Sequence, residues 1–415
     1  MRSTHAIIAS ALLGVSALMP ARAIDVQDFD QIQRGKYLVA VGDCGGCHTL
    51  PGSGELLAGG RPIETPFGTL LGPNITPDRE TGIGAWTDDE FINSLTKGTG
   101  RNGAHIYPAM PYTYMTKTTR EDGLAIRAYL NTIPAVHNPV QPNQLRFPFD
   151  VRTGLFAWDE LHFRPGEFQP VAGKSAAWNR GAYLVEGLAH CGLCHTPKTA
   201  AGADEISRRF TGYALEGWFA PDITNDMRHG IGSWSTDDVM TYLKTGHNRF
   251  AAANGPMALV ITDSTSKLSY DDLDAIATYL KNQPVENAAN VAEQAGAPDA
   301  GVMKSGGTIY ADQCAACHAS DGSGVDGLFP MLQGSAVVQS LDPASVLHVI
   351  LRGARSVATD PAPTAPAMPS FAWTLTDDQV AAVATYIRNA WGNHAPPVET
   401  ATVGQTRRTL EERAD

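Results

Sequence analysis

Two cysteines at positions i and i+3, followed directly by a histidine, occur three times in this 415-residue chain. The motifs are CGGCH from Cys44, CGLCH from Cys191 and CAACH from Cys314, and together they contain all six cysteines. This spacing suits three kinds of chemistry, namely a zinc site, a redox-active dithiol, or a haem attached through two thioether bonds. The rest of the sequence has to distinguish them.

Haem is the cofactor that explains every residue of the motif. Structural zinc takes four ligands, usually from two cysteine pairs brought together, whereas these pairs lie more than 100 residues apart. A dithiol needs no following histidine. In haem c the thiols add to the two vinyl groups and the adjacent histidine ligates the iron. We therefore expect three covalent haems c (with iron), attached at Cys44, Cys47, Cys191, Cys194, Cys314 and Cys317, with His48, His195 and His318 as proximal ligands.

Each iron needs a ligand on its other face, and three methionines beside prolines are the best candidates. They are Met110 in YPAMPY, Met257 in NGPMAL and Met368 in APAMPS, which follow the motif histidines by 62, 62 and 50 residues. A neighbouring proline suits a rigid loop that presents one side chain. Thioether ligation would raise the reduction potential. The rival ligands are Met115, Met227, Met240, Met331, His105, His229, His247 and His348.

An internal repeat indicates three domains. RGKYLVAVGDCGGCHT resembles RGAYLVEGLAHCGLCHT, and NITPDRETGIGAW matches DITNDMRHGIGSW at an offset of 148 residues. The third copy is more compact. Each copy ends in a segment with apolar residues at helical spacing, such as DGLAIRAYLNTIP. We expect an all-α fold of three tandem class I cytochrome c domains with long loops, each wrapped around one haem.

The expected boundaries follow from these repeats and from the chain ends. Arg2, the apolar stretch AIIASALLGVSALM and the site ARA are typical of a cleaved signal peptide. The connector after the first domain has seven aromatic residues, so it should pack across two domains or face a partner. The segments are a signal peptide at 1–23, domains at 24–134, 179–284 and 304–392, the connector at 135–178, a linker at 285–303, and a loosely held polar tail at 393–415.

Composition narrows the possible functions. The chain is 43% hydrophobic and 18% charged, which is typical of a globular protein. Its formal net charge is −12, and no basic stripe offsets this charge, so nucleic acid is not expected as a partner. No nucleophile and base arrangement or nucleotide-binding fingerprint is evident. Saturated His/Met coordination would leave no open iron site, which argues against a peroxidase.

Taken together, these residues resemble the trihaem cytochrome c subunits of bacterial membrane-bound dehydrogenases. That family includes alcohol dehydrogenase subunit II and the cytochrome subunits of gluconate, sorbitol and fructose dehydrogenases. The resemblance covers nearly the whole mature chain and includes YPAMPY, YLKTGHN and PTAPAMPSFAW. In monohaem cytochromes c a proline carbonyl accepts the hydrogen bond of the proximal histidine, and Pro73, Pro221 and Pro330 occupy suitable positions.

The resemblance implies an electron-transfer role. A quinone- or flavin-dependent catalytic subunit would oxidise an alcohol, sugar or sugar acid, and the haems would pass electrons to ubiquinone or another cytochrome. The expected location is the periplasm, at the outer face of the inner membrane. Because the sequence ends in GQTRRTLEERAD, attachment should be peripheral or through a partner. Two alternatives are the cytochrome subunit of a molybdenum hydroxylase and a free periplasmic shuttle.

Overall fold

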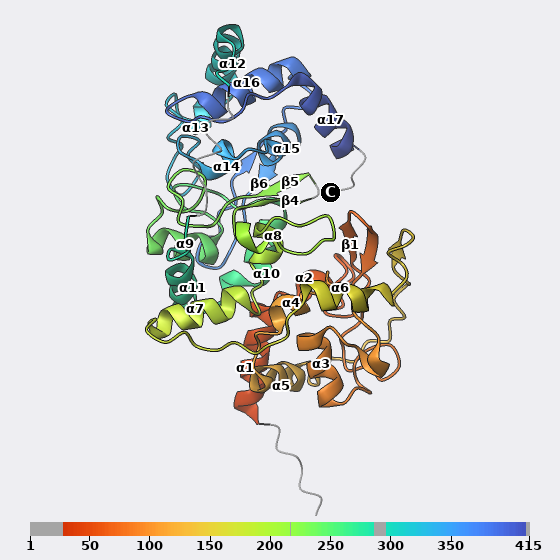
Figure 1. The fold of residues 1–415 in the computed structure, drawn as a ribbon. Coiled ribbons are helices and arrows are strands. Elements are labelled where there is room, and N and C mark those ends of the chain that lie inside the picture. The colour runs from red at the N-terminus through yellow and green to blue at the C-terminus, as the bar shows by residue number, and fades with distance from the viewer. Residues whose placement is uncertain (1–27, 216, 286–295, 412–415) are drawn as a thin grey trace, which may run out of the picture.

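Three pairs of crossed helices organise the molecule (Figure 1). The computed structural model describes residues 28–215, 217–285 and 296–411, so the predicted signal peptide and part of the predicted linker lie outside the described residues. We call the parts the first unit (α1 to α5), the second unit (α7 to α11) and the third unit (α12 to α16). The pairs are α1 (Phe29–Val41) with α5 (Arg120–Leu130), α7 (Ala176–Glu186) with α11 (Tyr270–Leu280), and α12 (Ala300–Gln313) with α16 (Asp377–Asn389).

The helices of each pair touch at a glycine. A Cβ atom added to this glycine would overlap a carbonyl oxygen of the partner helix, so no other residue allows such a close approach. The repeated contact shows that the three units share one way of crossing their helices, in agreement with the sequence repeat. The Cβ-to-oxygen distances would be 1.8 Å for Gly35 and Ala125, 1.9 Å for Gly181 and Ala275, and 2.2 Å for Gly306 and Ala382.

Shorter elements fill the loops between the two helices of each pair. The first unit has α2 (Cys44–His48), β1 (Pro62–Thr65), β2 (Gly68–Leu71), α3 (Asp88–Lys97), η1 (Arg101–Gly103) and α4 (Tyr112–Met115). The second has α8 (Gly192–His195), η2 (Ile206–Arg208), β4 (Tyr213–Leu215), β5 (Trp218–Ala220), α9 (Thr236–Thr245), α10 (Gly255–Asp263) and η3 (Thr265–Lys267). The third has α13 (Ala315–His318), α14 (Ala336–Gln339), α15 (Ala344–Arg352), β6 (Ala354–Arg355) and β7 (Ala367–Met368).

The strands mean that the expected all-α class is correct only in part, because the structure is helix-rich but also contains small antiparallel sheets. β1, β2 and β3 (Gln144–Leu145) form one sheet, β4 pairs with β5, and β6 pairs with β7. Gly68 and Gly217 have φ values of +126° and +82° at the turns of the first two hairpins. These left-handed conformations, which favour glycine, allow the long loops to fold back on themselves.

The first and second units are joined by two matching sets of polar contacts. In each set, the carboxylate near the start of one unit's last helix accepts hydrogen bonds from an arginine of its own unit and from a tyrosine of the other unit. A single apolar core with residues from both units lies behind these contacts. The pairs are Asp122 with Arg34 Nε (2.5 Å) and Tyr183 Oη (2.5 Å), and Asp272 with Arg180 Nε (2.7 Å) and Tyr37 Oη (2.6 Å).

Asp272 should make the stability of this interface depend on pH. Burial raises its pKa, but hydrogen bonds from Arg180 and Tyr37 outweigh burial and lower the pKa below the ordinary value of about 4. Such a group contributes stability that is fully present above its unfolded pKa and is lost as pH falls through the folded value.

We expect the free energy of unfolding to fall more steeply in the wild type than in Asp272→Asn when the pH drops below about 4. Denaturant unfolding on either side of this pH measures the effect. Asp271→Asn, an exposed change one residue away, is the control and should retain the wild-type acid sensitivity. Equal acid sensitivity in the wild type and Asp272→Asn would contradict the assignment.

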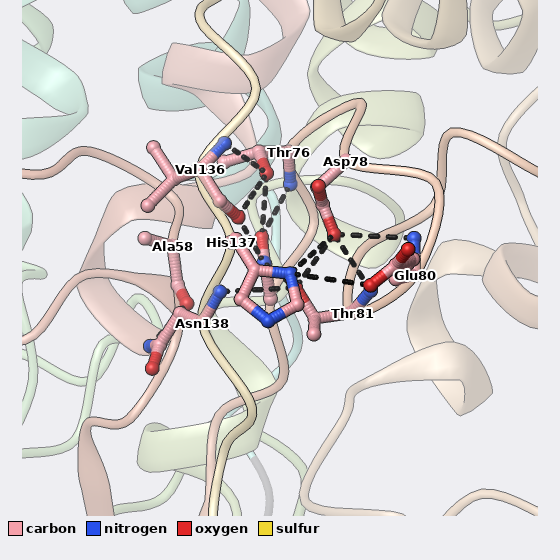
Figure 2. Close-up of polar contacts among 9 residues, drawn as sticks. Ala58, Thr76, Asp78, Glu80, Thr81, Val136, His137 and Asn138 are labelled. Atoms are coloured by element: carbon pink, nitrogen blue, oxygen red, sulfur yellow. Dashed lines mark hydrogen bonds and ion pairs between the residues drawn. The ribbon is translucent and has the colours of Figure 1, made fainter.

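The first residues of the connector form hydrogen bonds with a loop that follows the first CxxCH motif. Figure 2 shows its first residues beside the loop at 74–81. The backbone N–H groups of Val136 and Asn138 donate to the hydroxyls of Thr76 (3.2 Å) and Thr81 (3.0 Å). The side chain of His137 lies within 3.7 Å of a carboxylate oxygen of Asp78. The connector therefore restrains the loop between the first motif and the first candidate methionine.

Further along, the connector packs on the two units and also exposes aromatic rings. That it faces a partner stays a prediction. Phe163, after α6 (Gly154–His162), is buried with its ring 5.1 Å from that of Tyr112. The indole of Trp158 donates to the carbonyl of Ala201 in the second unit (2.8 Å). Other rings face solvent, namely Phe147, Phe149 and Phe156.

The third unit has a core of its own, and the C-terminal segment belongs to it. The sequence suggested a loosely held tail, but residues 400–411 form α17 (Thr400–Glu411), which packs on α15 and α16 and buries Val403 and Leu410. Arg407 Nε donates to the carboxylate of Asp377 (2.8 Å). Apolar residues seven positions apart give too sparse a pattern to predict an amphipathic helix.

Candidate haem-binding sites

Each CxxCH motif forms a single helical turn that follows the first helix of its pair within a few residues. The turns are α2, α8 and α13, with Cys191 and Cys314 at the N-caps of the last two. Positions i and i+3 lie on one face of such a turn, so the two thiols of a motif point the same way. None of the six cysteines forms a disulfide bond. This arrangement is compatible with two thioether bonds to one porphyrin.

The environment of the thiols does not fit a redox-active dithiol. Burial raises the pKa of Cys44 and Cys191 to about 12 and the pKa of Cys47 and Cys314 to about 11. Redox-active cysteines instead have lowered pKa values, because the thiolate is the reactive form. Across the described ranges, no three or more His, Cys, Asp or Glu side chains gather in a way that could hold a metal ion.

The histidine of each motif is oriented by a proline carbonyl, as predicted. The Nδ1 atoms of His48, His195 and His318 lie close to carbonyl oxygens of the predicted prolines. A carbonyl only accepts, so Nδ1 carries the proton and Nε2 keeps a free lone pair for a metal. The distances are 2.7 Å to Pro73, 2.7 Å to Pro221 and 3.1 Å to Pro330.

The same histidines are held in the neutral form that metals require. Burial lowers the pKa of all three imidazoles below the ordinary value, and the proline hydrogen bond only partly opposes this effect. A neutral imidazole with a fixed tautomer is the usual state of a metal-binding histidine. The donor set therefore fits an iron porphyrin bonded to the adjacent thiols. Haem iron held in this way supplies one-electron transfer.

The three candidate methionines lie on different kinds of backbone, and only the first is in the loop that the sequence suggested. Met110 precedes α4, Met257 lies in α10, and Met368 lies in β7. All three are half-buried and pack against the apolar cores. Their pairing with His48, His195 and His318 stays a prediction.

Several of the rival ligand residues have surroundings that account for them without an iron. Met115 is buried in the core, and Met227 is 70% exposed. His105 binds Asp159, His229 binds Asp226, and His348 binds the carbonyl of Gly217. The Nε2 atoms of His229 and His247 are both buried, with no hydrogen-bond partner among the described residues. These two histidines therefore remain rivals that their environments do not fully explain.

The first two motifs face one another, a relation that the sequence did not reveal. The Nε2 atom of His190 lies 3.3 Å from the carbonyl oxygen of Gly42. His190 directly precedes the second motif, and Gly42 lies two residues before the first. Tyr114, close behind Met110, contacts Gly192 inside CGLCH. In the third motif, by contrast, Cys317 is exposed. A tyrosine in YPAMPYTYM gives no signal of such a long-range contact.

Comparisons with known proteins agree with this chemistry. The cytochrome c family model matches residues 303–391. The gluconate 2-dehydrogenase cytochrome c subunit of Pantoea cypripedii is 38% identical over 89% of this chain and 88% of its own. The alcohol dehydrogenase (quinone) cytochrome c subunit of Komagataeibacter europaeus is 37% identical over 97% and 88%, and the fructose dehydrogenase cytochrome subunit of Gluconobacter japonicus is 38% identical over 91% and 82%.

No helix within residues 28–215, 217–285 and 296–411 has both the length and the apolar character needed to span a membrane. The CxxCH turns, the oriented histidines and the similarity over most of the chain lead to one assignment. The chain belongs to the family of cytochrome c subunits of alcohol, gluconate and fructose dehydrogenases.

Proposed function

We propose that this protein is an electron-transfer subunit with three haems c in three tandem cytochrome c domains. It accepts electrons from the catalytic subunit of a dehydrogenase that oxidises an alcohol, a sugar or a sugar acid. It passes them to ubiquinone or another respiratory acceptor at the periplasmic face of the inner membrane. The observation that carries the proposal is the motif histidine donating to a proline carbonyl, which recurs in all three units.

The residues of each unit have separate tasks in this function. The two cysteines would attach the porphyrin to the chain, and the proline carbonyl sets the tautomer and the ring orientation of the histidine. The histidine and the methionine would hold the iron, and thioether ligation would raise its reduction potential. A haem held by these residues would supply one-electron transfer, and the substrate chemistry would belong to the partner.

The haem count and the methionine ligands can be tested together. The mass of the purified mature chain should equal the polypeptide plus three haems. Met110→His, Met257→His and Met368→His should each lower the potential of one haem, since His/Met ligation gives a higher potential than two histidines. Spectroelectrochemical titration would resolve one reduction wave for each haem. Met227→His is the control, because this methionine is exposed and should move no wave.

The partner is tested by affinity purification of the protein from its native membranes. A co-eluting dehydrogenase that reduces the haems when an alcohol, a sugar or a sugar acid is added would support the proposal. Elution without such a chain, together with no substrate-dependent reduction, would contradict it and favour a free shuttle. A wild-type mass with fewer than three haems would contradict the haem assignment.

A further inference from the structure

A side chain of the first unit reaches the second CxxCH motif. Tyr114 lies on α4, four residues after Met110, and is 5% exposed. A Cβ atom added to Gly192, the residue after Cys191, would lie 2.7 Å from the Tyr114 hydroxyl oxygen. The tyrosine therefore occupies the space beside the turn that carries Cys191, Cys194 and His195.

A chain of polar contacts extends this packing around the motif. The Tyr114 hydroxyl donates to the carboxylate of Asp204, which also pairs with the ammonium group of Lys198. Lys198 Nζ in turn donates to the carbonyl oxygen of Gly192 (3.3 Å). Burial and the neighbouring carboxylate of Asp204 raise the pKa of Tyr114, so the phenol stays protonated and remains a donor.

The charged groups of this chain lie beside the residues that would hold the second haem. Lys198 is three residues after His195, and its ammonium group is held at the motif by the carbonyl of Gly192 and pairs with Asp204. Any change in how far Asp204 neutralises Lys198 would therefore change the charge beside CGLCH.

The contacts between the two units are reciprocal, because residues of the second unit also bind the segment that precedes the first CxxCH motif. His190 contacts the carbonyl of Gly42, and the hydroxyl of Ser264 donates to the carbonyl of Val41 (3.2 Å). Ser264 directly follows α10, the helix that carries Met257, and α10 contacts α2. The segment that carries the candidate methionine in each unit therefore packs against the CxxCH segment of the other unit.

We propose that Tyr114, a residue of the first unit, is a positioning residue for the second haem, acting through Asp204 and Lys198 on CGLCH. The inference rests on the proposed function, because it requires a haem at that motif. Without the tyrosine, the Asp204 carboxylate loses a hydrogen-bond donor and its negative charge is less neutralised. Negative charge near the iron stabilises the oxidised, more positive state.

Two substitutions with opposite charge effects test the proposal in the full-length haem-loaded chain. Tyr114→Phe should lower the potential of the second haem. Asp204→Asn removes the negative charge and should raise it. The waves of the first and third haems should keep their positions. The wave of the second haem is identified beforehand as the one that Met257→His lowers.

Tyr112→Phe is the matched control. Tyr112 lies on the same short helix, is fully buried, and donates to Asp159 of α6 at 2.6 Å. The Tyr112→Phe variant loses a similar hydrogen bond, but to the connector, and should shift the reduction potential of no haem. The proposal is overturned if Tyr114→Phe and Asp204→Asn shift the second wave in the same direction, or if Tyr112→Phe shifts it as much as Tyr114→Phe.

The haem content separates this outcome from failure of the proposed function. Peptide mass spectrometry of the wild type shows whether CGLCH carries a haem. If it carries none, the proposed function is contradicted and the inference falls with it. If the haem is present but its potential is the same in the wild type and in Tyr114→Phe, only the inference is overturned.

Discussion

Gly181→Ala should lower the free energy of unfolding by about 3 kcal/mol or more, at the upper end of the cost of overpacking a core. The new Cβ would lie 1.9 Å from the carbonyl oxygen of Ala275 and 2.7 Å from the Cβ of Tyr279. Both are parts of a rigid helix that cannot rotate away, so α7 and α11 would have to separate. Denaturant unfolding of the haem-loaded chain, followed by circular dichroism, measures the loss.

Gly154→Ala is the matched control for this prediction. Gly154 is the first residue of α6, and a Cβ there would have no atom within 4 Å. Alanine favours helix by up to about 1 kcal/mol over glycine, so this change should be neutral or slightly stabilising. Equal stabilities of the two variants would show that the close helix crossing does not limit the side chain at Gly181.

Loss of the second attachment site should have wider consequences than loss of the third. Cys191→Ala/Cys194→Ala should remove one haem and also destabilise the first unit, because residues of both units form one core and Cys191 packs against it. Cys314→Ala/Cys317→Ala should remove one haem and leave the first two units intact, because most of the third unit's core is separate. Haem content and hydrogen exchange of α1 and α5 measure the difference.

Comparing the two double variants shows whether the first unit depends on the second motif more than on the third. Faster exchange in α1 and α5 is expected only when the second motif is changed, since amide exchange reports local opening. If both variants leave these helices equally protected, the first and second units are stable independently of one another. If both expose them equally, the third unit also supports the first.

Much of the candidate site was predictable from short stretches of sequence. The CxxCH spacing predicted the thiols and the histidine, and the resemblance to monohaem cytochromes c predicted the proline carbonyls that the structure places at His48, His195 and His318. The repeat predicted three similar copies, each ending in a helical segment. These features depend on covalent connection or on contacts that each unit repeats within itself, so a local pattern is enough to reveal them.

Other features required the folded chain. No pattern in the sequence indicated that Tyr114 lies against Gly192, or that Asp122 and Asp272 each bind a tyrosine of the other unit. The helix α17 and the short hairpins were also missed. In each case the partners are far apart in the chain or the apolar residues are too few to give a period.

The sequence by itself therefore determined the chemistry of each unit, because the thiols and the imidazole are placed by the local CxxCH spacing. Only the tertiary structure decided how the units meet. It brought the attachment segments of the first and second units face to face and left Cys317 of the third exposed. The physical reason is that contacts between units depend on the packing of whole surfaces, which no single stretch of residues encodes.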